Sequence, residues 1–372
     1  MALDIKAAVV EAKDQPFVIE DVVLDEPRAD EVLVRIVAAG ICQTDAHVVH
    51  QHLPTPLPAV LGHEGAGIVE RVGPAVTSVK PGDHVVLSYQ ACGHCAQCLS
   101  GHYAYCDQAM EANFSGARLD GTIGLHRRPD AQEPGDLNAH FFGQSSFATY
   151  ALTTERNTAK VPDDAPLELL APLGCGLQTG AGAVLNSLRV EPGSAFAVFG
   201  TGAVGLAAVM SAAIAGASVI IGVDINDGRL QLAKELGATH TVNPLRDDVP
   251  AEIRRITGSG VNYLLDTTGR NDMLQHAVAS MASRGQIGLV ASAGTDTTVP
   301  AGALALGISV RGIVQGDAIA QTFIPELVRQ YQAGRFPFDK LVRFYPFEDI
   351  NEAFDAAGRG EVIKPVLRIG QP

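Results

Sequence analysis

Four cysteines lie within fifteen residues of this chain, in the pattern Cys92-x2-Cys95-x2-Cys98-x7-Cys106. Gaps of two residues let neighbouring thiolates converge on one ion, and zinc binds four thiolates tetrahedrally. Because four protein ligands leave no coordination position open, the pattern predicts a structural zinc site rather than a catalytic one. An iron–sulfur cluster, which also uses cysteine thiolates, and four incidental thiols are the alternatives.

The other two of the six cysteines suggest a second metal site. Cys42 lies in Gly-Ile-Cys-Gln-Thr-Asp-Ala-His, Cys175 lies in Pro-Leu-Gly-Cys-Gly, and His63 lies between them in Gly-His-Glu-Gly-Ala-Gly. Two thiolates and one imidazole leave the fourth position on zinc open, as catalytic zinc sites require. Taken singly, each residue is weak evidence, because a lone buried cysteine usually acts as a small hydrophobic residue.

A glycine-rich turn predicts a dinucleotide site. Gly-x-Gly-x-x-Gly follows an apolar strand and opens a helix, which suits a turn that brings pyrophosphate to a helix N-terminus. The expected cofactor-binding residues of this turn are Gly200, Gly202, Ala203, Val204 and Gly205.

Asp224 ends the next apolar strand, 24 residues after Gly200. A carboxylate there accepts hydrogen bonds from a free ribose 2′-hydroxyl and repels a 2′-phosphate, so we predict NAD rather than NADP. The nearby Arg229 is a further candidate for contact with the ribose. The alternative role for Asp224 is that of a helix N-cap.

Composition narrows the class of protein. The chain has 372 residues, a length that suggests two domains, and with 47% hydrophobic and 18% charged residues it can bury a large core. Its net charge of −14 argues against nucleic acid or an anionic membrane as a partner. No apolar run reaches the ~18–20 residues of a membrane span, and no signal-peptide pattern opens the chain. We therefore expect a cytoplasmic protein whose cysteines form no disulfides.

Hydrophobic patterning predicts two kinds of architecture. The first third is β-rich, and the pattern changes near residues 170–195 to short apolar runs that alternate with helices. Such alternation indicates an α/β fold with a doubly wound parallel sheet. Strands are expected at 7–10, 32–37, 66–72, 84–88, 195–199, 219–223, 263–265, 286–290, 308–314 and 362–369, and helices at 205–215 and up to Leu236.

With these residues assigned, the chain resembles the zinc-containing medium-chain alcohol dehydrogenases from end to end. The marks are the four-cysteine pattern and segments 62–67, 174–176 and 223–226. Within that family it looks most like the aryl-alcohol (benzyl alcohol) dehydrogenases, on segments 113–116, 141–147, 172–182 and 336–341.

The resemblance implies a GroES-like catalytic domain over residues 1–176 and 319–372, with the structural zinc lobe at 90–108. A Rossmann NAD-binding domain would occupy residues 177–318. The implied cofactors are NAD and two Zn²⁺ per chain, one catalytic and one structural. The catalytic zinc would activate a primary alcohol, and the nicotinamide would accept the hydride.

The resemblance also implies roles for residues near the open zinc site. Thr44 would hydrogen-bond the substrate oxygen, and His47 would pass the proton to solvent. Asp45 would orient His63, and Glu64 would act behind the zinc by its charge or as a transient ligand. Thr179 would line the nicotinamide.

One position departs from several relatives, which carry a basic residue after the first zinc cysteine. Here it is Gln43, so we expect a weaker electrostatic hold on the pyrophosphate and faster NADH release. Aromatic residues at Tyr89, Phe114 and Phe141 are candidates for the substrate pocket or for the core.

Several alternatives remain open at this point. The substrate would be a benzyl-type alcohol, with allylic terpenoid alcohols such as geraniol as close competitors. A glutathione-dependent formaldehyde dehydrogenase and a non-catalytic nucleotide-binding relative are less favoured, the second because the complete second metal constellation would then have no purpose. We also expect a homodimer or homotetramer that pairs through an edge strand near Ile308–Val314.

Overall fold

The computed structural model describes residues 2–131, 135–291 and 297–371. The chain forms two compact units. The first unit comprises Met1–Cys175, Ile319–Gln332 and Asp339–Pro372, and the second comprises Gly176–Ala318 and Ala333–Phe338. The first division falls one residue before the expected boundary at 176/177, and residues 333–338 group with the second unit rather than with the C-terminal return.

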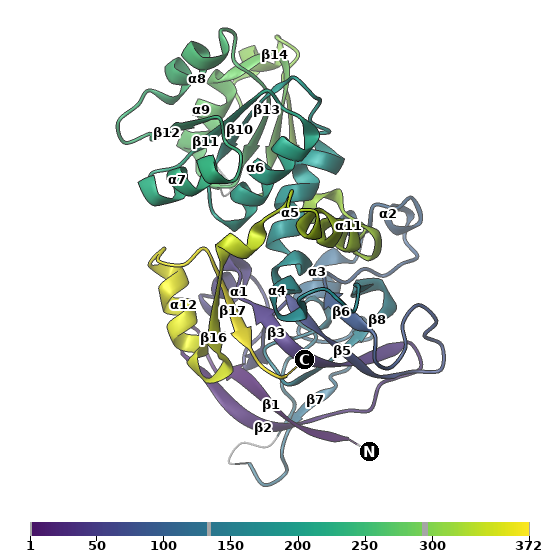
Figure 1. Cartoon of the computed structure of the whole chain (residues 1–372). Helices are drawn as coiled ribbons and strands as arrows, with labels where there is room; N and C mark the ends of the chain where they lie inside the picture. The colour runs from purple at the N-terminus through teal and green to yellow at the C-terminus, as the bar shows by residue number, and fades with distance from the viewer. Residues whose placement is uncertain (1, 132–134, 292–296, 372) are drawn as a thin grey trace. The chain divides into compact units, whose positions relative to one another are not determined.

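Two sheets build the first unit, which holds both chain ends (Figure 1). The larger sheet has the order β16-β17-β3-β5-β6-β9, with β8 also paired to β3, and the smaller has the order β4-β1-β2-β7. The strands of the larger sheet are β3 (Glu31–Gly40), β5 (Gly65–Val72), β6 (His84–Leu87), β8 (Tyr150–Thr154), β9 (Thr158–Lys160), β16 (Val342–Pro346) and β17 (Lys364–Arg368). Those of the smaller sheet are β1 (Leu3–Val10), β2 (Phe17–Leu24), β4 (Ala59–Val60) and β7 (Leu125–Arg127).

Strand β3 is the centre of this unit because nine of its ten residues are buried. It pairs antiparallel with β5 and with β17, so a strand of the N-terminal part and the C-terminal strand are neighbours in one sheet. The β3–β5 register places Ala39 opposite Gly65. The segment that follows β3 and the segment that precedes β5 therefore leave the sheet side by side.

Short helices connect these strands, and two longer ones come from the C-terminal return. The shorter helices are α1 (Gln43–Val49), α2 (Ala96–Leu99), α3 (Ala109–Phe114) and α4 (Leu167–Leu170); the longer are α11 (Ala320–Gln332) and α12 (Ile350–Gly358). Phe354 of α12 packs at 4.8 Å from Phe17 and 5.9 Å from Phe147, measured between ring centroids. Aromatic burial of this kind ties the C-terminal return to the N-terminal sheet.

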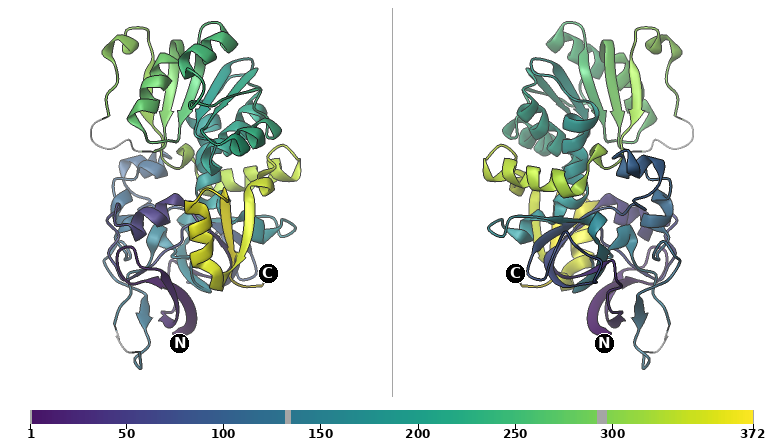
Figure 2. Two further views of the ribbon diagram at one scale, coloured as in Figure 1. Left: turned by 90° about the vertical axis from the view of Figure 1, so that its left-hand side faces the viewer. Right: turned by 90° about the vertical axis from the view of Figure 1, so that its right-hand side faces the viewer.

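A six-stranded parallel sheet forms the second unit within the described residues, in the order β12-β11-β10-β13-β14-β15. This order, with helices on both faces of the sheet (Figures 1 and 2), is that of a Rossmann fold and confirms the expected α/β class. The strands are β10 (Ala195–Phe199), β11 (Val219–Val223), β12 (His240–Val242), β13 (Val261–Asp266), β14 (Met281–Leu289) and β15 (Ser309–Gly312). The helices are α5 (Gly176–Gly182), α6 (Ala203–Ala215), α7 (Asp227–Glu235), α8 (Val249–Thr257), α9 (Asn271–Ala279) and α10 (Ala301–Leu304).

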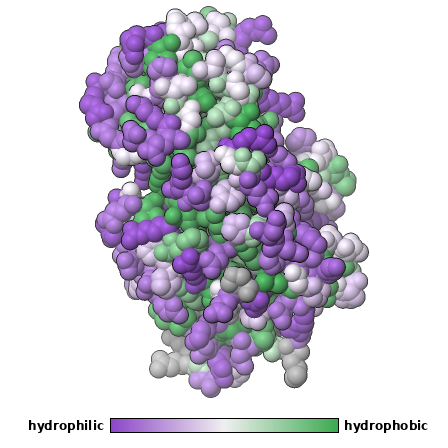
Figure 3. Space-filling view, in the orientation of Figure 1, coloured by the Kyte–Doolittle hydropathy of each residue, from purple (hydrophilic) through white to green (hydrophobic). Residues whose placement is uncertain are grey.

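Most expected strands are confirmed, and the differences lie at their ends. Helix α6 begins at Ala203, two residues before the expected start, because Gly202 already serves as its N-cap. Strand β15 is shorter than the expected run 308–314. The hydropathy surface in Figure 3 shows hydrophilic side chains around scattered hydrophobic ones. Among the described residues, none of the helices combines the length and apolarity of a membrane span.

Candidate active site and metal centres

The residues expected at the second metal site come together at one end of the β3–β5 pair. Cys42 is the N-cap of α1, two residues after the end of β3, while His63 and Glu64 immediately precede β5. The amide of Gly40 donates to the carbonyl of Glu64 at 2.9 Å, which holds the two segments together. Cys175 completes the group, and one ligand atom from each of these four residues lies within 4.8 Å of the others.

His63 has the environment of a metal ligand. It is fully buried, and its Nδ1 lies 3.0 Å from Oδ1 of the equally buried Asp45. Its Nε2 is buried and has no hydrogen-bond partner among the described residues. A buried polar atom without a partner is costly, and coordination of Nε2 to a metal ion would satisfy it.

Asp45 organises the ligand loops beyond its contact with His63. Its carboxylate accepts hydrogen bonds from the backbone amide of Cys42 at 3.0 Å and from that of Gly62 at 3.1 Å. These contacts fix the loops on both sides of the site. The expected role of Asp45 in orienting the imidazole matches this geometry.

The chemistry of the donor set fits zinc. A hydrogen bond from Cys175 is the largest of the causes that hold the pKa of Cys42 well below its usual value, and the nearby His63 adds to it. A thiolate is the form of cysteine that binds metal. Two thiolates and an imidazole are the ligands of a zinc site with an open position, and Glu64 is the additional oxygen donor within reach.

Lys364 is a member of this site that the sequence analysis missed. Its Nζ donates to both carboxylate oxygens of Glu64 at 3.0 Å and to the carbonyl of Ile41 at 3.0 Å. Both side chains are buried, with exposures of 3% for Lys364 and 0% for Glu64. Burial lowers the pKa of Lys364, but Glu64 together with Cys42 and Cys175 raises that pKa overall, so the lysine is charged. The signal for this residue was a lysine immediately before the apolar residues of the C-terminal strand.

Helix α1 carries the other residues expected to handle the alcohol proton. The hydroxyl of Thr44 lies 3.8 Å from Sγ of Cys42. His47 is exposed, and its Nδ1 lies 3.4 Å from Nδ1 of His52, a neighbour that the sequence analysis did not single out. Burial, and then the charge of His52, lower the pKa of His47 from its usual value. Gln43 is exposed at the start of the same helix.

Aromatic rings cover one side of the imidazole of His63. The ring of Phe142 stacks on it at 4.5 Å, and Phe141 meets it edge-on at 5.4 Å between centroids. Phe114 in turn packs against both phenylalanines at 5.9 and 5.2 Å. Of the three aromatic residues expected near the pocket, Phe141 is 1% and Tyr89 7% exposed, whereas Phe114 is half-buried. Phe142 was not anticipated.

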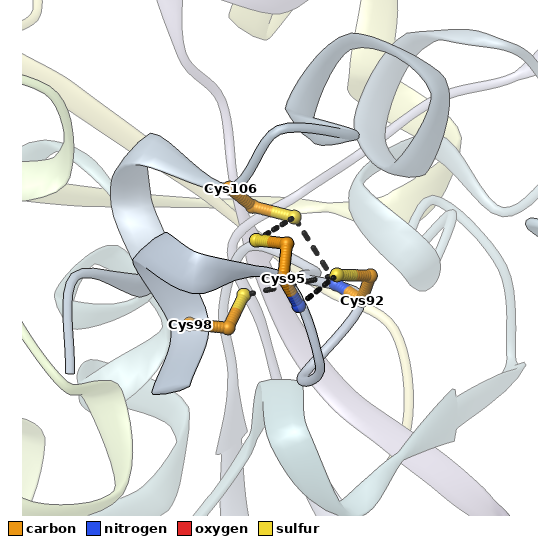
Figure 4. A group of neighbouring side chains, drawn as sticks. All are labelled: Cys92, Cys95, Cys98 and Cys106. Atoms are coloured by element: carbon orange, nitrogen blue, oxygen red, sulfur yellow. Dashed lines mark hydrogen bonds between the residues drawn. The ribbon is translucent and has the colours of Figure 1, made fainter. Parts of the chain in front are cut away.

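The four-cysteine lobe is a closed site in which the thiols point toward one another (Figure 4). Sγ of Cys92 lies 3.9 Å from Sγ of Cys98, and Sγ of Cys95 lies 4.0 Å from Sγ of Cys106. Sulfurs at about 2.3 Å from one tetrahedral zinc are separated by close to these distances. Backbone amides of the lobe donate to the sulfurs, including that of Cys92 to Cys106 at 3.3 Å. The turn at Gly93 has φ +80°, as expected for the knuckle.

The dinucleotide turn lies between β10 and α6 in the second unit. Gly200 has φ +88°, and a Cβ at Gly205 would lie 1.9 Å from the carbonyl oxygen of Gly200, so both positions need glycine. A Cβ at Gly202 would meet no atom within 4 Å, which leaves the backbone there open to a ligand. Ala203 and Val204 form the first turn of α6, whose N-terminus suits an anionic phosphate.

Asp224 follows β11, as expected, and is 8% exposed. One carboxylate oxygen accepts from the amide and hydroxyl of Thr201 at 2.7 and 2.9 Å, which ties Asp224 to the glycine-rich turn. The N-cap of α7 is Asn226, which accepts from the amide of Arg229 at 3.1 Å, so Asp224 is not that cap. Thr179 lies in α5 and is 9% exposed.

Two protein-family models and a curated relative match this chain. Residues 28–163 match the alcohol dehydrogenase GroES-like domain, and residues 203–332 match the zinc-binding dehydrogenase domain. A geraniol dehydrogenase of Castellaniella defragrans is 46% identical over 367 residues, which cover 97% of each chain.

Two solved structures are similar over nearly the whole chain. An alcohol dehydrogenase zinc-binding domain protein from Burkholderia ambifaria is 53% identical, with a TM-score of 0.97 and full coverage of both chains. The benzyl alcohol dehydrogenase of Acinetobacter calcoaceticus is 48% identical, with a TM-score of 0.95 and coverage of 99% of this chain and 100% of that one.

Proposed function

Because this chain belongs to the family of zinc-containing medium-chain alcohol dehydrogenases, we propose that it oxidises aromatic primary alcohols of the benzyl type reversibly to aldehydes, with NAD⁺ as hydride acceptor. The observation that carries the proposal is the buried, unpartnered Nε2 of His63 beside Cys42 and Cys175. That arrangement supplies three ligands and leaves room for a substrate oxygen.

In the proposed mechanism the chain's own residues position the metal and move one proton. Zinc, when bound, supplies a Lewis acid that favours the deprotonated form of the alcohol. Asp45 holds His63 in the tautomer that presents Nε2. Thr44 bonds the alcohol oxygen, and His47 receives the proton and releases it to solvent. The lowered pKa of His47 suits this role, because the imidazole is then neutral near pH 7 and able to accept a proton.

The preference for an aryl alcohol is supported by the aromatic group around His63. Phe114, Phe141 and Phe142 form an apolar wall beside the metal ligand, and Phe114 is the least buried of the three. Aromatic side chains offer favourable edge and face contacts to an aryl group. The benzyl alcohol dehydrogenase similar to this chain is consistent with that choice.

A second candidate is the oxidation of an allylic terpenoid alcohol such as geraniol. The specific observation in its favour is the 46% identity to a curated geraniol dehydrogenase over almost the entire chain. An apolar aromatic wall also suits the isoprenoid chain of such a substrate, because apolar contact is not directional.

The substrate is tested by kcat/KM values with NAD⁺ for benzyl alcohol, a coniferyl-type alcohol, geraniol, ethanol and hydroxymethylglutathione. We expect benzyl alcohol to give the highest value. A higher value for geraniol would select the second candidate, and a higher value for ethanol would exclude both. A requirement for glutathione would indicate a formaldehyde dehydrogenase, and absence of turnover with every alcohol would indicate a non-catalytic relative.

The choice of NAD over NADP rests on Asp224. Its buried carboxylate lies at the end of β11 beside the glycine-rich turn, where it repels a 2′-phosphate. A higher kcat/KM with NADP⁺ than with NAD⁺ would contradict this assignment. The proposal for Gln43 is tested separately: Gln43→Arg should tighten NADH binding, and an unchanged dissociation constant would refute the idea.

We also propose a homodimer or homotetramer, paired through β15. This strand lies at the edge of the six-stranded sheet, the position from which a sheet can be continued by another chain. Leu304, Leu306 and Val314 near it are exposed. Sedimentation of a monomer at micromolar concentration would contradict the proposal. The cytoplasmic location stays a prediction.

A further inference from the structure

A cavity of about 220 Å³ lies in the first unit, apart from both metal centres. None of the six cysteines, nor His63 or Glu64, lines it. Its walls include Arg28, Glu31, Ala117, Arg118, His140 and Leu152. Because one water occupies about 30 Å³ of the liquid, the volume is large enough for a small organic molecule.

Arg118 contributes a buried hydrogen-bond donor without an acceptor. Its side chain is nine-tenths buried, and it donates through Nε to one oxygen of Glu31 at 2.5 Å and through Nη2 to the other at 3.3 Å. Its Nη1 is also buried and has no partner among the described residues. A guanidinium only donates, so a group that satisfies Nη1 must offer an acceptor atom.

His140 contributes a second polar group of the same kind. It is 7% exposed, and its Nε2 has no hydrogen-bond partner in the described part of the chain. Burial, followed by the positive charges of Arg118 and Arg28, lowers the pKa of His140 to about 3. The imidazole is therefore neutral at ordinary pH and has one nitrogen that donates a hydrogen bond.

The ionic groups that line the cavity are equal in number, three arginines and three carboxylates. Glu31 neutralises Arg118, and Asp120 pairs with Arg28 at 2.7 Å. Arg156 and Asp30 also line the cavity; both are exposed, and neither makes an ion pair within the described chain. Although these charges balance in number, Arg118 and Arg28 lower the pKa of His140 by more than Asp120 raises it.

We propose that this cavity binds a small organic carboxylate. The carboxylate accepts hydrogen bonds from Nη1 of Arg118 and from the imidazole of His140, and the organic part lies against Ala117 and Leu152. Charge-assisted hydrogen bonds from a guanidinium to a carboxylate are among the stronger ones in proteins. The proposal does not depend on the substrate of the metal site.

The location is tested by soaking crystals of the zinc-loaded full chain with 4-bromobenzoate and measuring the anomalous signal of bromine. We expect a peak in the cavity lined by Arg118 and His140. A peak at the catalytic metal site alone, or no peak at all, would overturn the proposal.

Binding in solution is measured by calorimetric titration of the zinc-loaded chain with benzoate. Ala117→Leu fills the cavity without a change of charge, and we expect it to weaken the cavity binding event by at least about tenfold, the equivalent of 1.4 kcal/mol. Arg156→Gln, which leaves the buried Arg118–Glu31 pair intact, should weaken it too. Ala251→Leu, at an exposed position of α8 outside the cavity, is the matched control.

The kcat/KM for alcohol should stay unchanged in Ala117→Leu, which separates the cavity from the active site. Benzoate binding that is equally tight in Ala117→Leu and in the wild type would overturn the proposal. Titration with inorganic phosphate distinguishes a site for an organic acid from a general anion site, and tighter binding of phosphate than of benzoate would overturn the assignment to a carboxylate.

Discussion

The buried pair of Glu64 and Lys364 should contribute measurably to the stability of the fold. Lys364→Met leaves a buried carboxylate without its cation, and removal of one member of such a pair costs about 3–5 kcal/mol. We expect urea unfolding of the full chain to show a loss of this size. The double variant Glu64→Gln/Lys364→Met removes both charges and should recover most of it. Equal stability of the single and double variants would contradict the ion-pair explanation.

Asp45 gives a second prediction at the same scale. Asp45→Asn weakens the hold on Nδ1 of His63 and should lower the zinc affinity of the catalytic site by about 10–100-fold. The measurement is zinc release to a chelator of graded strength. Zinc in the four-cysteine lobe serves as the internal control, since Asp45 makes no contact with it. If zinc leaves the catalytic site of Asp45→Asn and of the wild type at the same chelator strength, Asp45 does not orient His63.

At the residue scale, the candidate metal ligands could be predicted from the sequence, but some of the residues that contact them could not. Cysteines and a histidine in recognisable sequence motifs identified the ligands. Lys364 was missed because it is 300 residues from Glu64 and no local pattern shows that a lysine at the start of a strand is buried. Phe142 escaped because its stacking on His63 depends on a left-handed backbone at φ +53°, which local sequence does not specify for phenylalanine.

At the scale of elements, the four-cysteine lobe should depend on its ion. Cys98→Ser removes one of four ligands, so we expect the chain to lose one zinc and the segment 90–108 to become sensitive to protease. Gln97→Ala changes an exposed neighbour in the same helix and should do neither. Zinc content and limited proteolysis measure the outcome, and a protease-resistant Cys98→Ser chain would argue against a structural role for the metal.

The glycine-rich turn allows a paired test. Gly205→Ala places a Cβ 1.9 Å from the carbonyl oxygen of Gly200, and such overpacking should destabilise the second unit by about 1–3 kcal/mol. Gly202→Ala meets no protein atom, so its stability should be unchanged while NAD⁺ binding weakens by about tenfold or more. Thermal unfolding and NAD⁺ titration separate the two effects. Normal NAD⁺ affinity in Gly202→Ala would contradict the proposed approach of the pyrophosphate.

Strands β10 and β11 of the second unit could be predicted to the residue because each short apolar run there is a buried parallel strand, whereas β12 was not expected and β15 is mostly exposed. Thus 195–199 and 219–223 coincide with β10 and β11. The first unit was harder, because bulges and loops interrupt its strands. The pairing of β3 with β5 shifts register twice, and no local pattern reveals such shifts.

At the scale of the whole molecule, the chain assembles its first unit from distant segments. Strand β17 pairs with β3 antiparallel, with Val366 opposite Gly40, which places the third strand of the chain beside the C-terminal strand β17. Hydrophobic periodicity identifies both strands but cannot pair them, because register depends on tertiary packing. The return of the chain to the first unit was therefore an inference from family resemblance rather than from pattern.

We propose that this molecule holds two zinc ions with different functions: a structural ion at the closed four-cysteine site and a catalytic ion at the site open to substrate. This proposal is tested most directly by counting zinc and measuring benzyl alcohol oxidation in the wild type and in Cys175→Ser. We predict two zinc ions per wild-type chain, and one ion with no oxidation in the variant, since serine replaces a thiolate ligand of the open site. A single ion in the wild type, or full activity in Cys175→Ser, would contradict the account.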